Sequence, residues 1–196
     1  MSVTINPKRL YGSWHTGFAL DYHTISSELV GTNASGYKEF DTKRSPIGEL
    51  LFQLKNRSNK AVANDIIDTV VAFLGHYPIS CDVIIPVPPS KDRPFQPVLL
   101  LAQGIGKRIN VQVADCVIRT RPNQQIKNVV DLHDRKKELE GLYALNACPV
   151  AGKHLLLFDD LMRSGVTLNA ITDLLLRHGQ AGRVDVLTIT RTRKNQ

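Results

Sequence analysis

The sequence predicts an α/β fold in which a central, mostly parallel sheet is flanked by helices. Apolar runs of strand length alternate with longer stretches whose apolar residues recur at helical spacing. Strands that alternate with helices pair in parallel through right-handed crossovers. The length of 196 residues and the apolar content of 42% suit a single compact domain. We expect an N-terminal hood or extension over 1–45 and a core over 46–196.

The core is expected to begin with two helices. Ser45 and Pro46 suit the start of a first helix with one apolar face, formed by Ile47, Leu50, Leu51 and Leu54. Ser58 suits the cap of a second helix that ends near Gly75. A strand is expected over 82–87. After it, Pro97 at a first helical position introduces a helix with an apolar stripe, formed by Val98, Leu101, Ala102, Ile105 and Ile109.

Residues 1–45 show no regular pattern. From residue 110 onward, strands and helices continue to alternate. A strand is expected around 111–118, followed by a polar segment to about Glu140. Leu155 to Phe158 is a continuous apolar run, which is typical of a strand buried on both faces. A helix follows, with Gly179 as its stop, and a last strand is expected around 184–190.

The carboxyl end of the strand at 155–158 carries the chemistry. Asp159 and Asp160 are followed by a small polar loop that opens a helix. At a helix start the first N–H groups lack intrahelical partners, so a phosphate can accept hydrogen bonds from several of them. Carboxylates repel phosphate but accept hydrogen bonds from the hydroxyls of a ribose. The pattern therefore predicts a ribose 5-phosphate site, whose phosphate loop is Leu161, Met162, Arg163, Ser164, Gly165, Val166 and Thr167.

Three blocks of sequence resemble type I phosphoribosyltransferases. LLLFDDLMRSGVTL is similar to their phosphoribosyl-pyrophosphate signature, with Ser164 where Thr is commoner. The stretches 82–90 and 93–96 resemble the first strand and pyrophosphate loop of the ComF-like and amidophosphoribosyltransferase-like branches. The stretch 119–143 resembles the flexible-loop region of ComF-like members. Unlike many of these, the chain has no N-terminal zinc ribbon, because it contains no Cys-x-x-Cys motif.

The resemblance implies the type I phosphoribosyltransferase fold with a small hood, and an enzyme that transfers phosphoribosyl groups, a glycosyltransferase. Asp159 and Asp160 would be catalytic, and no metal would be held by protein alone, since Mg²⁺ would bind mainly through the substrate. The pyrophosphate would be bound at Pro88, Pro89, Ser90, Lys91 and Arg93. The basic segment from 119 to 137 would act as a flexible lid through Arg119, Arg121 and Arg135, although most charge runs are ordinary solvated surface.

The composition of the chain limits where the protein can be located and what it can bind. No apolar run is long enough to span a bilayer, and the N-terminus has no signal-peptide core, so we expect a cytoplasmic protein. The three cysteines are isolated in the sequence, which excludes a zinc ribbon and argues against a structural disulfide. The net charge of +7 allows contact with nucleic acid, but no base-reading motif supports it.

Three functions follow in order of preference. The first is transfer of ribose 5-phosphate from phosphoribosyl pyrophosphate to an unidentified nitrogenous acceptor, with release of pyrophosphate. The bound ligand would be phosphoribosyl pyrophosphate or a nucleoside monophosphate. The second is a regulatory module that binds the ligand without transfer, and the third is a role linked to DNA uptake or nucleic acid. A homodimer is left open. Aromatic residues near the N-terminus, including Trp14 and Phe18, suit either a hood that stacks on a base or the core.

Overall fold

The computed structural model describes residues 1–33, 35–77, 79–90, 95–121 and 141–193. Its centre is a six-stranded sheet in which four neighbouring pairs are parallel and only the pair at the N-terminal edge is antiparallel. The expected α/β class is confirmed. In order across the sheet, the strands are β1 (Lys8–Arg9), β2 (Thr16–Tyr22), β10 (Arg183–Arg191), β9 (His154–Met162), β5 (Val83–Pro86) and β6 (Gln112–Val113).

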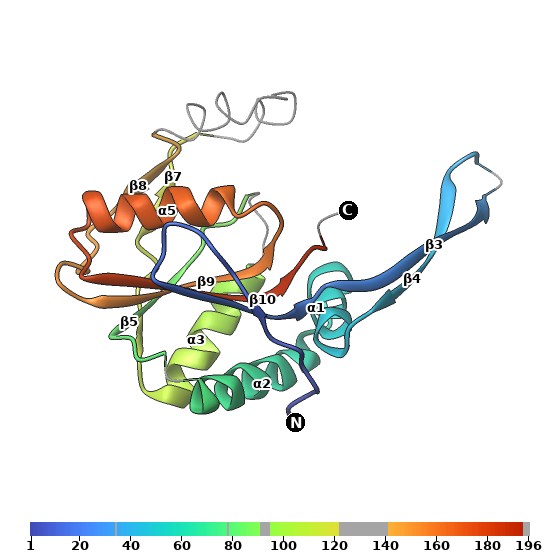
Figure 1. Cartoon of the computed structure of the whole chain (residues 1–196), viewed down its shortest axis with the longest axis horizontal. Coiled ribbons are helices and arrows are strands. Elements are labelled where there is room, and N and C mark those ends of the chain that lie inside the picture. The colour runs from blue at the N-terminus through green and yellow to red at the C-terminus, as the bar shows by residue number, and fades with distance from the viewer. Residues whose placement is uncertain (34, 78, 91–94, 122–140, 194–196) are drawn as a thin grey trace.

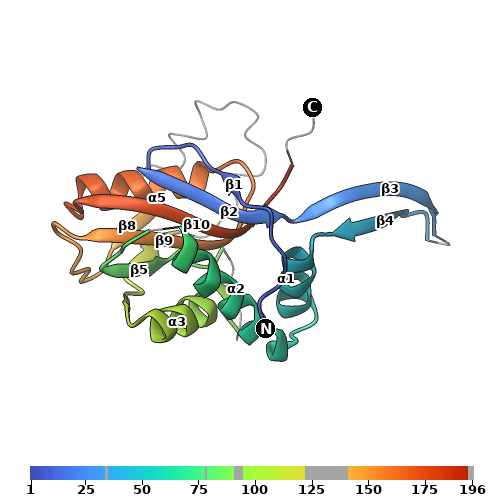
Figure 2. The ribbon, with the colours of Figure 1, turned by 60° about the horizontal axis from the view of Figure 1, so that its bottom comes forward.

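Helices cover both faces of this sheet (Figures 1 and 2). α1 (Pro46–Asn56), α2 (Ala63–His76) and α3 (Pro97–Ile109) lie on one face, and α5 (Val166–Arg177) lies on the other. The side chains of β9 alternate between the two layers: Leu155 and Leu157 pack with the α5 layer, and Leu156 and Phe158 pack with the layer of α1 to α3. This confirms that the apolar run of β9 is buried on both faces.

The expected helix starts are confirmed with one exception. The Ser45 hydroxyl accepts the Gly48 N–H at 3.1 Å, and prolines occupy the first turns of α1 and α3. Ser58 does not cap α2. It adopts a φ of +52°, and Asn59 instead caps a short 3₁₀ turn, η1 (Lys60–Val62), that leads into α2. The expected strand at 111–118 is two short strands, β6 and β7 (Val117–Arg119), and β7 pairs with β8 (Tyr143–Leu145).

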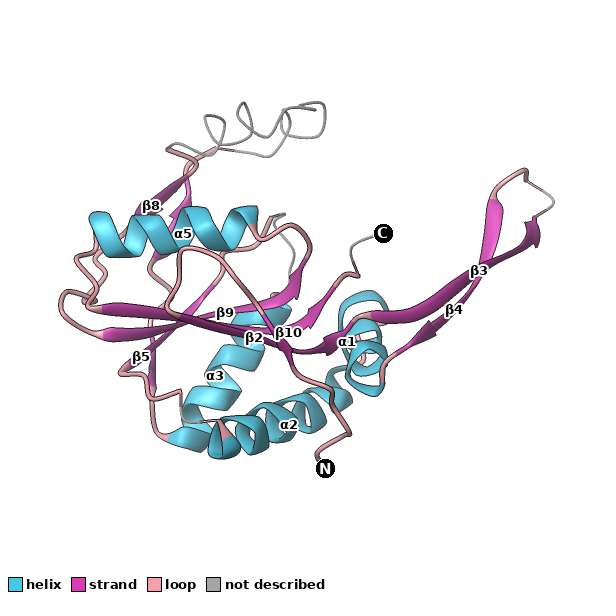
Figure 3. Ribbon diagram, in the orientation of Figure 1, coloured by secondary structure: helices cyan, strands magenta, loops and turns pink. Residues whose placement is uncertain are grey.

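The first 45 residues are not irregular. β1 and β2 extend the central sheet, because β2 pairs in parallel with β10. After β2 the chain forms β3 (Thr24–Thr32) and β4 (Lys38–Arg44), an antiparallel ribbon that projects away from the sheet and its helices (Figure 3). The division of the chain at residue 45 stays a prediction.

Two of the three cysteines lie together. Cys116 and Cys148 form a disulfide, with their Cα atoms 5.2 Å apart, at the base of the β7–β8 hairpin. The expectation of no structural disulfide was wrong, because the hairpin brings together two cysteines that are 32 residues apart. Cys81 is free, and burial raises the pKa of its thiol to about 11. Among the described residues, no helix is long and apolar enough to cross a bilayer.

Candidate functional site

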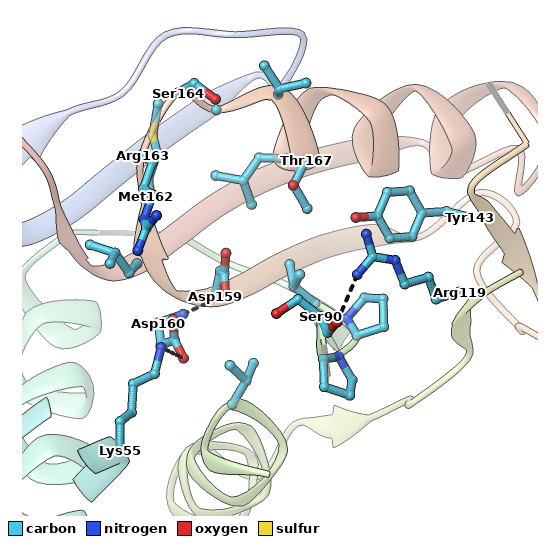
Figure 4. Close-up of a pocket in the computed structure, with 18 of the residues that line it drawn as sticks. Lys55, Ser90, Arg119, Tyr143, Asp159, Asp160, Met162, Arg163, Ser164 and Thr167 are labelled. Atoms are coloured by element: carbon cyan, nitrogen blue, oxygen red, sulfur yellow. Dashed lines mark hydrogen bonds and ion pairs between the residues drawn. The ribbon is translucent and has the colours of Figure 1, made fainter. Parts of the chain in front are cut away.

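One cleft of about 1240 Å³ opens at the carboxyl ends of β5 and β9 (Figure 4). It is lined by the site residues that the sequence predicts and the structure describes: Pro88, Pro89, Ser90, Arg119, Arg121, Asp159, Asp160, Leu161, Met162, Arg163, Ser164, Gly165, Val166 and Thr167. Lys91, Arg93 and Arg135 lie outside the described residues. Three segments that are distant in the sequence therefore meet at the edge of the sheet where ligands of α/β proteins usually bind.

The two aspartates belong to β9, which continues past the apolar run to Met162. Because side chains alternate along a strand, Asp159 and Asp160 point to opposite faces of the sheet. Asp160 lies on the side of α1, where Lys55 Nζ is 2.8 Å from its Oδ2 atom. Asp159 Oδ1 accepts the backbone N–H of Asp160 at 2.8 Å.

Burial and neighbouring charges shift the pKa of Asp159. Burial, together with the negative charge of Asp160, raises the pKa of Asp159 well above the usual range of a carboxyl. The hydrogen bond from the Asp160 N–H and the cation of Lys55 oppose this shift but do not cancel it. The raised pKa favours the protonated form of Asp159 near neutral pH, and Asp160 is paired with Lys55.

His23 lies close to this pair. Its Nδ1 is 3.3 Å from the Thr190 hydroxyl, which donates to the Asp160 carbonyl oxygen at the same distance. Burial lowers the pKa of His23, and the cations of Arg44 and Lys55 lower it further. A neutral imidazole is therefore expected beside the carboxylates.

The loop between β9 and α5 is built for a close approach of the backbone. Gly165 has a φ of +80°, and a Cβ placed on it would meet Met162 Cε at 2.8 Å. α5 begins at Val166, and its first intrahelical bond runs from the Asn169 N–H to the Gly165 carbonyl oxygen. Within the described parts of the chain, no acceptor is recorded for the N–H groups of 163–167. These amides are available to an anion.

Three residues from elsewhere in the chain support this loop. The Asn169 side chain donates to the Gly165 carbonyl oxygen at 3.1 Å and accepts the Ser13 N–H at 2.7 Å. Trp14 is buried in the α5 layer, and a Cβ placed on Gly165 would lie 3.8 Å from its ring. The segment between β1 and β2 is therefore linked to the phosphate loop through Asn169.

The opposite wall of the cleft is formed by the strand-to-helix turn after β5. The Val87 N–H continues the pairing with β9 by donating to the Phe158 carbonyl oxygen at 2.9 Å. Arg119 Nη1 donates to the Ser90 carbonyl oxygen at 3.3 Å. The guanidinium lies 5.8 Å from the ring centroid of Tyr143, and its Nε has no acceptor among the described residues. Arg119 thus supplies a cation at the wall that faces the phosphate loop.

Sequence reasoning missed Lys55, Asn169 and Tyr143. Lys55 follows the buried Leu54 on α1, and no local pattern distinguishes it from a solvated lysine. Of the aromatic residues near the N-terminus, Trp14 is a core residue, and Phe18 packs against Phe73 with ring centroids 5.6 Å apart.

The donor set bears on the expected magnesium ion. In the part of the chain that the structure describes, no group of three or more His, Cys, Asp or Glu side chains is placed to hold a metal ion. Asp159 and Asp160 are the carboxylates of the cleft, and Lys55 already neutralises one of them. Because Mg²⁺ prefers about six hard oxygen ligands, this set fits an ion that receives most of its ligands from a bound diphosphate and water.

Among curated proteins, two proteins of the same name, from two organisms, match this chain. The DNA utilization protein YhgH of Escherichia coli strain K12 is 33% identical over 101 residues, which are 51% of this chain and 43% of that protein. The same holds for the protein of this name in Shigella flexneri. The match thus spans less than half the length of these relatives. No family model matches the chain.

Solved structures with a similar chain path include two phosphoribosyltransferases. The adenine phosphoribosyltransferase of Trypanosoma brucei, in complex with AMP, pyrophosphate and ribose-5-phosphate, is 14% identical, with a TM-score of 0.49, over 89% of this chain and 71% of that chain. The orotate phosphoribosyltransferase of Aeropyrum pernix is 14% identical, with a TM-score of 0.44, over 86% of this chain and 76% of that chain.

Proposed function

We propose that this chain is a type I phosphoribosyltransferase of the ComF-like or amidophosphoribosyltransferase-like branch. It would transfer ribose 5-phosphate from phosphoribosyl pyrophosphate, with Mg²⁺, to a nitrogenous acceptor and release pyrophosphate. One observation carries the proposal: the unpaired amides of 163–167 and the carboxylates of Asp159 and Asp160 line the same cleft. A phosphate subsite beside a subsite for hydroxyls matches the two ends of a ribose 5-phosphate.

Binding follows from the donors and acceptors. The amides of the loop and the hydroxyls of Ser164 and Thr167 donate to the terminal phosphate, at about 1.5 to 3 kcal/mol for each bond to a charged group. Several such bonds outweigh the helix dipole, which contributes about 0.3 to 1 kcal/mol. Asp160 accepts from one ribose hydroxyl. Asp159, which carries the proton in the free site, can donate to the oxygen of the other.

The transfer step needs no protein nucleophile. The bond between ribose C1 and the pyrophosphate oxygen breaks, and its electron pair leaves with pyrophosphate. The lone pair of the acceptor nitrogen forms the new bond to C1, and the nitrogen then loses its proton to solvent. Positive charge develops on the ribose in the transition state, where the carboxylate of Asp160 stabilises it. Arg119 stands beside Ser90 on the wall assigned to pyrophosphate.

When bound, Mg²⁺ would stabilise the charge of the leaving pyrophosphate. The residues in position to hold it are Asp159 and Asp160, in addition to the substrate's own oxygens. Lys55 lines a cavity together with Asp160 and Ser90, so it would supply a cation near both the ribose and the diphosphate.

A second candidate is a module that binds phosphoribosyl pyrophosphate or a nucleotide without transfer. It is favoured by the Lys55–Asp160 ion pair, because a carboxylate that is paired with a cation stabilises the positive charge of a transition state less well. The name of the E. coli relative, a DNA utilization protein, fits a regulatory role linked to DNA, and a basic chain permits contact with nucleic acid. Nucleic acid would be a partner of this module and not a substrate.

The two candidates are separated by one set of measurements on the full chain. Calorimetry with phosphoribosyl pyrophosphate and Mg²⁺ measures binding, and pyrophosphate release is followed with purines, pyrimidines and simple amines as acceptors. The transferase requires binding and release with at least one acceptor, whereas the module requires binding alone. Absence of binding contradicts both.

A variant pair tests the role of Asp160. Asp160→Asn should bind the ligand weakly and release no pyrophosphate. Asp173→Asn, on α5 outside the residues that line the cleft, is the matched control and should behave as the parent protein. Equal turnover in Asp160→Asn and in the parent would remove Asp160 from the mechanism.

A further inference from the structure

The β3–β4 ribbon is the part of the molecule that the proposed function does not use. It projects from the domain as two strands, and no other described helix or strand forms a layer over it (Figures 1 and 3). Two neighbouring residues of the ribbon, Leu29 and Phe40, are exposed to 56% and 53% although they are large and apolar. An isolated two-stranded ribbon is marginally stable in water, and a third strand or a packed face is usually needed. The ribbon therefore lacks the partner that such an element requires.

Its two free edges are not equivalent. Two register shifts interrupt the pairing, and in both cases the extra residue, Ile25 or Val30, belongs to β3. Bulges of this kind protect an edge against pairing with another strand. β4 runs through Lys38–Arg44 without a bulge, a proline or a glycine. The outer edge of β4 is therefore the edge that can accept a further strand.

Two acidic residues of the ribbon face each other across the strand pair. Glu28 lies directly opposite Asp41, and like charges in this position destabilise a strand pair. Among the described residues, neither carboxylate has an ion-pair partner, and Lys43 has none either. A cation placed beside Asp41 on the free edge of β4 would relieve the repulsion.

The strand itself can supply that cation. We propose that β4 pairs in an antiparallel manner with β4 of a second copy of this chain, about a two-fold axis at Thr42. This register places Lys43 of each copy beside Asp41 of the other, and it places the two Thr42 side chains opposite each other. The two ribbons then form one continuous four-stranded sheet, and the interface is isologous.

Other registers with the same symmetry are worse. Centring the pair on Asp41 places two carboxylates against each other, and centring it on Lys43 places two ammonium groups against each other. Centring it on Phe40 sets Glu39 against Asp41. Of these four centres in β4, Thr42 is the one that yields opposite-charge pairs without a like-charge pair in the strand.

The charge balance also argues against nucleic acid as the occupant. The strands carry three acidic residues and three basic ones, Glu28, Glu39, Asp41, Lys38, Lys43 and Arg44. A neutral ribbon gives no attraction to a phosphate backbone, which is the main source of affinity for nucleic acid. This inference does not depend on the proposed function, because the ribbon contributes no residue to the cleft.

Sedimentation of the full chain tests the proposal. The parent protein is expected to be a concentration-dependent dimer. Asp41→Lys turns two attractive contacts into two repulsive ones and should raise the dimer dissociation constant by about tenfold or more. The double variant Asp41→Lys with Lys43→Asp restores opposite charges and should recover most of the affinity. A parent protein that stays monomeric, or a dimer that Asp41→Lys leaves unchanged, overturns the proposal.

Cross-linking tests the register. Thr42→Cys places two thiols on the two-fold axis and should give a disulfide-linked dimer on mild oxidation. Ser27→Cys is the matched control. Ser27 pairs with Thr42 within the ribbon, but it lies on β3, one strand further than β4 from the proposed two-fold axis. Thermal unfolding checks that both variants fold as the parent does. Equal cross-linking of both variants, or none of Thr42→Cys, contradicts the register.

Discussion

Lys55 on α1 forms an ion pair with Asp160 on β9, with 2.8 Å between Nζ and Oδ2. Both side chains are mostly shielded from solvent, with exposed fractions of 28% and 12%. The helix that Ser45 caps therefore reaches the carboxyl groups of the cleft and pairs one of them with a cation.

Removal of Lys55 should destabilise the protein through Asp160. In Lys55→Met the carboxylate loses its cation while it stays largely buried, and a cost of about 1 to 3 kcal/mol is expected at pH 7. The double variant with Asp160→Asn should recover part of this loss. Urea unfolding of the two single variants and the double variant measures the coupling, and purely additive effects would show that the pair contributes nothing.

Asp159 should make stability fall as pH rises. Its pKa is raised to about 8 in the folded protein, against 3.8 for a free carboxyl, so the folded state holds an extra proton between these values. Stability is therefore lost progressively from about pH 4 to about pH 8. Asp159→Asn lacks this dependence and should be more stable than the parent by about 1 to 3 kcal/mol at pH 8, with no difference near pH 4. Unfolding curves across this range check the slope.

Gly165 should tolerate no side chain. Gly165→Ala places a Cβ at 2.8 Å from Met162 Cε with a φ of +80°, and we expect a loss of about 1 to 3 kcal/mol together with weaker binding of ribose 5-phosphate. Gly152→Ala is the control, because Gly152 has a φ of +70° but nothing within 4 Å of a Cβ. The difference between the two variants in urea unfolding measures the contact with Met162, and equal losses would refute it.

The hydroxyls of the phosphate loop should each contribute to affinity. Ser164→Ala and Thr167→Val each remove one donor to the phosphate, and each should weaken binding of ribose 5-phosphate by about tenfold. Thr192→Val, which follows β10 outside the cleft, should leave the affinity unchanged. Calorimetry with ribose 5-phosphate gives the values. If neither loop variant weakens binding, the phosphate is not held at this loop.

The Cys116–Cys148 disulfide should stabilise the oxidised protein. It closes a loop of 32 residues, for which about 3 to 4 kcal/mol is expected from the restricted unfolded chain. A thiol count in denaturant should give one free thiol in the oxidised protein, from Cys81, and three after reduction. A count of three without reductant would mean that the pair is not joined.

Local patterns in the sequence determined most of the helices and strands and the phosphate loop. Ser45, Pro46 and Pro97 act through the geometry of their own helix turns, and the run from Leu155 to Phe158 needs only the alternation of a buried strand. Asp159 to Thr167 is one continuous segment, so its two binding chemistries could be inferred without a tertiary structure. Ser58 misled the prediction because Asn59, the next residue, caps the 3₁₀ turn that leads into α2, and α2 itself has no side-chain cap.

Only the tertiary structure decided which distant groups meet. Lys55 and Arg119 line the cleft, and Asn169 supports its phosphate loop, because elements that are distant in the sequence meet at the carboxyl ends of β5 and β9; no local pattern encodes such contacts. The same holds for Cys116 with Cys148 and for the raised pKa of Asp159, which depends on burial and on a neighbouring charge. Periodicity and motif spacing are properties of short stretches of chain. Burial, charge pairing and the projection of the β3–β4 ribbon are properties of the packed whole.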